Sequence, residues 1–202
     1  AVAAAPSNPR YQSALGDCFL ALGRSGDAAD AYARAVALAP SNPEYIHNMG
    51  VAHLRGNAFK KAIEIINEAI KLRPQCAAYY CSRGIASSGL KNTKDAIRDY
   101  GAALALDRNN AYAHFLLASA YSDPDDPTYT SSFEAVEHAE AAVRLTRNRN
   151  PQYLMGLARA LRVARRYDKA VDVAKTAVAL DPRDEYKKEL AVFEQLKAQG
   201  VK

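Results

Sequence analysis

Histidine and cysteine are the residue types in this chain with the widest chemistry, as bases, nucleophiles and metal ligands. The histidines are His47, His53, His114 and His138, and the cysteines are Cys18, Cys76 and Cys81. The histidines are scattered without a His-Glu-x-x-His motif, and the cysteines have neither a zinc-binding spacing nor an even number. We therefore expect reduced thiols, no metal and no cofactor.

Acidic residues gather in the segment SDPDDPTYT, residues 122–130. A calcium loop would also need a central glycine and a distal glutamate, and both are missing. The chain also lacks a glycine-rich phosphate loop and a nucleophile elbow. The sequence therefore predicts a protein that is not an enzyme, with residues 122–130 as an acidic loop in solvent.

Basic residues are concentrated in one part of the chain. The formal net charge of +5 is too small for this length to indicate a nucleic-acid-binding protein by itself. Residues 144–169 nevertheless contain seven arginines and one lysine against a single acid, Asp168. Two interpretations stay open for this basic segment: a solvated face and a functional patch.

The elements that carry these residues follow a repeat. The stretch from Pro43 to Cys76 has counterparts on both sides at an offset of 34 residues. The recurring positions include Gly16, Gly50 and Gly84; Ala28, Ala62 and Ala96; Ala35, Ala69 and Ala103; and Leu38, Leu72 and Leu106. A fixed period of this length is typical of stacked helix pairs, in which each pair buries its apolar face against its neighbours.

The first two repeats each read as two helices separated by glycine or asparagine, with proline at the start of the first helix. The apolar spacing predicts helices at residues 10–22, 27–38, 44–55 and 58–72. In the fourth repeat, five additional residues fall within 122–130, and the next helix begins with a capping-box pattern at Ser131 and Glu134. Residues 185–199 form a last amphipathic helix that we expect to cap the array.

The spacing of large, small, aromatic, alanine and proline positions resembles the tetratricopeptide repeat (TPR) family over nearly the whole chain. The resemblance implies an all-α, right-handed superhelix, an α-solenoid of about five helix-turn-helix repeats with a C-terminal capping helix. The expected repeats are 9–42, 43–76, 77–110, 111–150 and 151–184, followed by the capping helix and tail at 185–202. Residues 1–8 resemble residues 35–42, and we expect them to be the end of a truncated preceding repeat of a longer protein.

In the family that this chain resembles, the first helix of each repeat lines a concave groove that binds peptides. The groove residues implied here are His47, Asn48, Val51, Arg55, Ile85, Tyr112, Phe115, Arg159 and Arg162. Ile85 and Phe115 would contact apolar side chains of the ligand, and the arginines would pair with its acidic residues. The alternative is packing beneath the inserted loop for Tyr112 and Phe115, and plain solvent exposure for Arg159 and Arg162.

One activity of the family can be tested by residue. TPR domains that clamp the C-terminal carboxylate of heat-shock chaperones use lysine, asparagine and arginine at fixed groove positions. Asn48 matches this pattern, but Ser13, Asp17, Ala78 and Ser82 occupy other positions of the clamp. We therefore exclude chaperone-tail clamping.

The resemblance implies a non-catalytic adaptor, a protein–protein interaction scaffold that binds a peptide segment of a partner protein. A self-assembling, homo-oligomeric scaffold is the alternative, and single-stranded nucleic-acid binding through residues 144–169 is a less favoured third interpretation. No apolar run approaches membrane-spanning length, so we expect no membrane insertion. The expectation of reduced cysteines favours the cytoplasm.

Overall fold

The computed structural model describes residues 7–199, and within that range it contains eleven α-helices and no strand. The chain divides into two compact units, residues 1–106 and residues 107–202. The all-α class predicted from the sequence is confirmed. Most of the predicted remnant of a preceding repeat, at residues 1–8, lies outside the described residues. None of the helices in the described part is both long enough and apolar enough to span a membrane.

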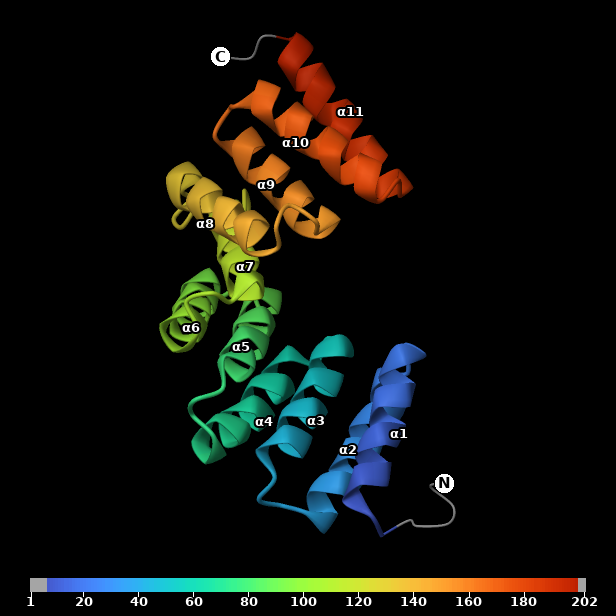
Figure 1. Ribbon diagram of the computed structural model, residues 1–202. Coiled ribbons are helices and arrows are strands. Elements are labelled where there is room, and N and C mark those ends of the chain that lie inside the picture. The colour runs from blue at the N-terminus through green and yellow to red at the C-terminus, as the bar shows by residue number, and fades with distance from the viewer. Residues whose placement is uncertain (1–6, 200–202) are drawn as a thin grey trace. The chain divides into compact units, whose positions relative to one another are not determined.

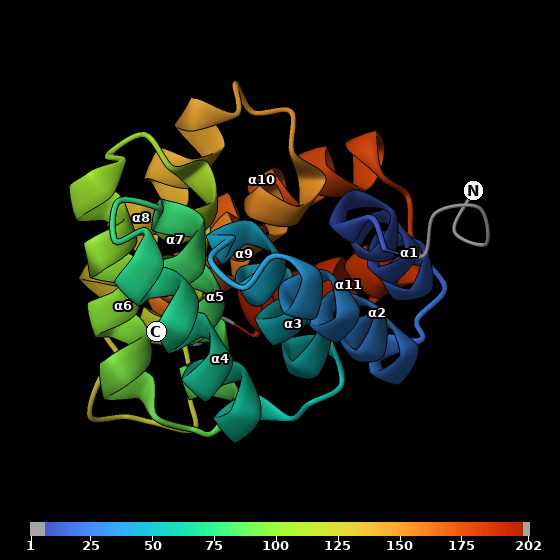
Figure 2. The same ribbon diagram turned by 90° about the horizontal axis from the view of Figure 1, so that it is seen from below.

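Unit 1 is built from three helix pairs (Figure 1). They are α1 (Pro9–Ala21) with α2 (Ser25–Leu38), α3 (Pro43–Arg55) with α4 (Phe59–Leu72), and α5 (Ala77–Gly89) with α6 (Thr93–Leu106). Each helix packs against the next, and the first helices of successive pairs also touch, α1 on α3 and α3 on α5. Figure 2 shows the pairs following one another in chain order from α1 and α2 to α5 and α6.

Unit 2 contains two helix pairs and a final helix. They are α7 (Ala111–Tyr121) with α8 (Ser132–Leu145), α9 (Pro151–Val163) with α10 (Tyr167–Leu180), and α11 (Asp184–Ala198). Consecutive helices pack on each other, and α7 also contacts α9. Within each unit the stacked helix pairs agree with the predicted helical repeat.

Asparagine and proline define where most first helices begin. The side chains of Asn8, Asn42, Asn110 and Asn150 accept a hydrogen bond from a backbone N–H in the first turn of α1, α3, α7 and α9, respectively. In α1, α3 and α9 a proline follows directly, where its missing N–H costs nothing. Cys76 stands at the equivalent position before α5 and makes no such bond.

Four of the first helices are followed by a residue with a left-handed backbone conformation, that is, a positive φ. Its φ is +72° at Gly23, +58° at Asn57, +59° at Lys91 and +57° at Arg165. The residue after it donates its N–H five residues back, as Arg24 does to the carbonyl oxygen of Phe19 at 2.8 Å. This arrangement is a Schellman motif, and it turns the chain into the second helix of the pair.

Small residues set the distance between paired helices. Ala28, Ala62, Ala96, Ala135 and Ala170 are fully buried. A Cβ atom added at Gly84 would lie only 2.5 Å from Tyr100 Cε1, and one at Gly50 would lie 2.6 Å from Ile66 Cγ1. These glycines therefore permit close packing of the paired helices.

The inserted segment of the fourth predicted repeat folds back on itself between α7 and α8. Thr130 Oγ1 lies 2.6 Å from the carbonyl oxygen of Asp123 and 3.1 Å from that of Asp126, so its single proton is shared between them. Ser131 is the N-cap of α8, but its hydroxyl donates to the carboxylate of Glu134 instead of accepting from the helix backbone. The helix start was predicted correctly, while the capping bond differs.

The last helix covers the end of unit 2. Tyr186 and Phe193 of α11 are buried in the same hydrophobic cluster as α9 and α10 residues, with Leu190 beside them. All three lie in the segment 185–199, which was predicted to form an amphipathic helix. α11 therefore packs as expected of a capping helix.

Candidate interaction surfaces

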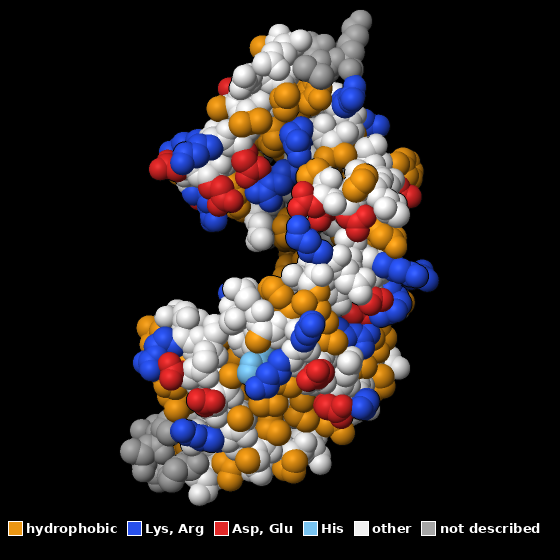
Figure 3. All heavy atoms as spheres, turned by 180° about the vertical axis from the view of Figure 1, so that it is seen from behind, with side chains coloured by type: hydrophobic (Ala, Val, Ile, Leu, Met, Phe, Trp, Pro, Cys, Tyr) orange, Lys and Arg blue, Asp and Glu red, His pale blue; other side chains and the backbone are white. Residues whose placement is uncertain are grey.

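The first helices of unit 1 form the surface on which most of the predicted groove residues lie. Asn48 and Val51 of α3 and Ile85 of α5 are half-buried, and Arg55 at the end of α3 is exposed. Because α3 contacts α5, these side chains lie on adjoining helices. We refer to Asn48, Val51, Arg55 and Ile85 as the unit 1 surface. On the face drawn in Figure 3, hydrophobic side chains adjoin one another over the lower part of the molecule.

His47, also predicted to face the groove, is tied into the α3–α5 contact. Its Nε2 lies 2.9 Å from Ser82 Oγ of α5, and its ring centroid is 4.6 Å from that of Tyr79. Burial lowers the pKa of His47, which keeps the ring neutral near pH 7. His47 therefore joins two repeats and borders the unit 1 surface.

Phe115 lies inside unit 2. It is only 9% exposed, and its ring centroid is 5.1 Å from that of Tyr153 on α9. A Cβ atom at Gly156 would come within 2.8 Å of the Phe115 ring, so that glycine makes room for it. Tyr112 stays 43% exposed one turn earlier on α7. Phe115 thus packs between α7 and α9, whereas Tyr112 keeps an accessible ring.

The two aromatic contacts share a register that sequence reasoning missed. Tyr79 and Tyr153 are each the third residue of a predicted repeat, and each covers the fifth residue of the repeat before it, His47 or Phe115. The available signal was the recurrence of tyrosine at Tyr11, Tyr45 and Tyr79, spaced by 34. When the fifth residue of the preceding repeat is bulky, as His47 and Phe115 are, the tyrosine packs on it. Much of that side chain is then not available to a ligand.

Arg159 on α9 already has a carboxylate partner within unit 2. Its Nε and Nη2 donate to the two carboxylate oxygens of Glu189 on α11 at 2.8 Å and 2.6 Å. The sequence had predicted that Arg159 would pair with an acidic residue of the ligand instead. Arg162, one turn further along α9, is half-buried. The bidentate pair therefore fastens the last helix to α9.

The basic segment 144–169 does not form one patch. Arg144, Arg147 and Arg149 lie at or after the end of α8, whereas Arg162, Arg165 and Arg166 lie at or beyond the far end of α9. The 13 residues of α9 separate the two groups, and a helix of that length spans about 20 Å. Figure 3 shows blue and red side chains interleaved on the face of unit 2 that it draws. Sequence proximity therefore overstated the local positive charge.

A buried ionic group in unit 1 was also not predicted. Arg83 donates to both carboxylate oxygens of Asp99, at 2.8 Å and 2.6 Å, and to Asn67 Oδ1 at 2.7 Å. Asp99 is only 1% exposed, and the contact joins α4, α5 and α6. Bidentate pairing compensates for the burial of the carboxylate, so this group is a structural connection between repeats.

The cysteines form no disulfide among the described residues, and the possible metal ligands there do not cluster. Cys18, Cys76 and Cys81 are free, and burial raises the pKa of the Cys81 thiol to about 12. Between residues 7 and 199, no three His, Cys, Asp or Glu side chains come together in a group that could hold a metal ion.

Comparison with known proteins identifies the fold family. Profiles of the tetratricopeptide repeat match residues 1–43, 43–76 and 134–185, and the chain belongs to this family. Among curated protein sequences, none is matched. The fold of this family supports a role as a protein–protein interaction scaffold.

Solved structures show the same fold at low sequence identity. TTC0263, a thermophilic TPR protein in Thermus thermophilus, is 18% identical with a TM-score of 0.78, over 93% of this chain and 99% of that chain. A chain of the APC/C hetero-tetramer Cut9–Hcn1 is 17% identical with a TM-score of 0.84, over 97% of this chain and 38% of that chain. YrrB, a TPR protein with an unusual peptide-binding site, is 14% identical with a TM-score of 0.61, over 92% of both chains.

Proposed function

We propose that this chain is a non-catalytic scaffold that binds an extended peptide segment of a partner protein on the unit 1 surface. The observation that carries the proposal is the position of Asn48, Val51 and Ile85, which are half-buried in adjoining first helices and still reach solvent. YrrB, which shares the fold, is described as a TPR protein with an unusual peptide-binding site.

The chemistry of the unit 1 surface suits a peptide with alternating apolar and acidic residues. Val51 and Ile85 offer aliphatic contacts that exclude water from an apolar ligand side chain. The amide of Asn48 matches the donors and acceptors of a peptide main chain, and the exposed Arg55 can pair with a carboxylate. We expect a micromolar dissociation constant, which corresponds to a binding free energy of about 8 kcal/mol.

Binding can be tested with peptides selected from a displayed library of 12-residue sequences. The affinity of selected peptides is then measured by fluorescence anisotropy for the unaltered chain, for Asn48→Ala with Arg55→Ala, and for Lys60→Ala with Glu64→Ala. The last two residues are exposed on α4 and serve as the matched control. We expect the Asn48→Ala, Arg55→Ala variant to bind at least about tenfold more weakly, equivalent to about 1.4 kcal/mol. The affinity of the control variant should be unchanged. Equal affinities for all three proteins would contradict the proposal.

Self-association is a second candidate, supported by two strongly exposed hydrophobic side chains. Leu22 is 71% exposed in unit 1, and Phe133 is 72% exposed in unit 2. Burying either side chain against another copy of the chain would remove its apolar surface from water. Sedimentation velocity should then show a concentration-dependent dimer that is lost in Leu22→Ser or Phe133→Ser. A monomer at all concentrations would exclude this candidate.

A further inference from the structure

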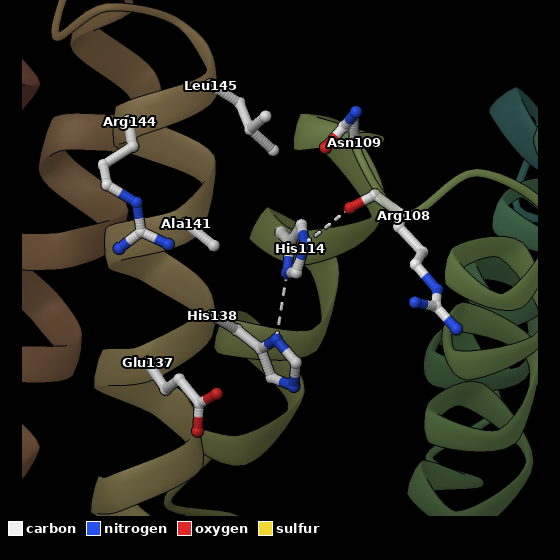
Figure 4. Close-up of a pocket in the computed structure, with 8 residues that line it drawn as sticks. All are labelled: Arg108, Asn109, His114, Glu137, His138, Ala141, Arg144 and Leu145. Carbon is white, nitrogen blue, oxygen red and sulfur yellow. Dashed lines mark hydrogen bonds between the residues drawn. The ribbon is translucent and has the colours of Figure 1, made fainter.

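Two histidines that are distant in sequence meet between α7 and α8. His114 Nδ1 lies 3.0 Å from His138 Nδ1, and the ring centroids are 5.2 Å apart (Figure 4). On its other side, His114 Nε2 lies 3.2 Å from the carbonyl oxygen of Arg108. A carbonyl oxygen only accepts, so His114 carries a proton on Nε2. When His114 is neutral its Nδ1 is therefore an acceptor, and the proton of the shared bond belongs to His138 Nδ1.

The surroundings of the pair contain charges of both signs. A cavity of about 390 Å³ opens beside it, lined by Arg108, Asn109, His114, Glu137, His138, Ala141, Arg144 and Leu145. The Tyr121 ring of α7 stacks on His138 with centroids 6.0 Å apart, and Glu134 and Glu137 are the acids of α8 that act on it. In Figure 4 the guanidinium groups of Arg108 and Arg144 lie on opposite sides of the histidines and do not converge on them. The cavity therefore does not form a cradle for a single anion.

Counting protons shows that the bond tolerates one added proton and not two. When one ring is protonated, its Nδ1 donates to the Nδ1 of the other, neutral ring, and the bond is kept. When both rings are protonated, each Nδ1 carries a proton. Two N–H donors and two positive charges would then face each other across 3.0 Å, so the hydrogen bond is lost and the rings repel.

We infer that the α7–α8 hairpin is a pH-responsive element, closed by the His114–His138 bond at neutral pH and loosened when acid protonates both rings. Residues 122–131 connect α7 to α8 and include the inserted segment 122–130. Loosening would therefore release the segment along with the helix contact. The inference concerns the stability of unit 2 and stands independently of the proposed peptide site.

The energetics of His138 support this direction. Burial lowers the pKa of His138, the charge of His114 lowers it further, and Glu137 and Glu134 oppose the shift. The folded protein then binds fewer protons at this site than the unfolded chain does. Stability contributed by the neutral ring is fully present above the unfolded pKa of about 6.5, and it is lost as pH falls toward the lower folded value.

Hydrogen exchange measured at about pH 7 and about pH 5 tests the inference, with rates corrected for the intrinsic effect of pH. His138→Asn is the informative variant, because its amide can donate to or accept from His114 and does not titrate. His53→Asn is the control, since His53 lies in unit 1 and is also a partly buried histidine with a lowered pKa.

We expect exchange of the α7 and α8 amides to accelerate at least about tenfold at the lower pH in the unaltered chain, the equivalent of one pK unit. The same acceleration is expected in His53→Asn and not in His138→Asn. An equal response in the unaltered chain and His138→Asn would overturn the inference. So would protection at neutral pH that depends on added Zn²⁺ and disappears with chelator, because the pair would then be a metal site.

Discussion

Replacing Phe115 by alanine should destabilise unit 2. The side chain is 9% exposed and fills the space between α7 and α9 against Tyr153 and Gly156. Truncating a buried phenylalanine costs about 3 to 5 kcal/mol through lost apolar burial and the cavity left behind. We expect about 3 kcal/mol here, the lower end, because the site borders the surface and Tyr112 can shift toward the gap.

The assay must follow unit 2 separately, because the chain divides into two compact units and a single unfolding curve would report on both. Hydrogen exchange resolved along the chain should show amides of α7 and α9 exchanging about 150-fold faster in Phe115→Ala, the equivalent of 3 kcal/mol. Amides of α3 in unit 1 should be unchanged. Tyr112→Ala is the matched control on the same helix, since its ring is 43% exposed and its loss should cost under about 1 kcal/mol. If Phe115→Ala accelerates exchange no more than this control does, the packing role is refuted.

Three further predictions concern unit 1. Gly84→Ala should destabilise it by about 1 to 3 kcal/mol in urea unfolding, because the new methyl group meets Tyr100 at 2.5 Å; an unchanged midpoint would contradict the packing. Asp99→Asn should cost about 2 kcal/mol, below the 3 to 5 typical of a broken buried pair because Arg83 retains some solvent contact, and a loss under 0.5 would refute a structural role. Burial lowers the pKa of His47, so stability should decline as pH falls below about 6.5, and unfolding curves of His47→Gln should show a smaller decline.

Much of the helical architecture was predictable because it depends on local signals. Asn42 caps the start of α3 and Pro43 is its first residue, so neighbouring residues specify where the helix begins. Gly23 provides the left-handed residue that ends α1. Periodic alanines such as Ala62 mark where helices of a pair cross. The repeat limits, which rest on the same period, remain predictions, although the helix pairs fall within them.

The candidate surfaces were less predictable because a position in a repeat does not reveal what its neighbours place against it. Phe115 and Asn48 were both predicted to line one groove. Phe115 is buried because Tyr153 stacks on it and Gly156 leaves room, whereas Asn48 keeps an accessible face. Arg159 likewise finds its carboxylate in Glu189, 30 residues away.

The sequence by itself determined the class of the protein, because a 34-residue period with helix caps and small crossing residues is satisfied by stacked helix pairs. Only the tertiary structure decided which charged and aromatic side chains are already paired. His114 and His138 read as unrelated in sequence, 24 residues apart, and meet at 3.0 Å because α7 and α8 run back along each other. Such contacts depend on side-chain directions across helices, and a linear period does not encode them.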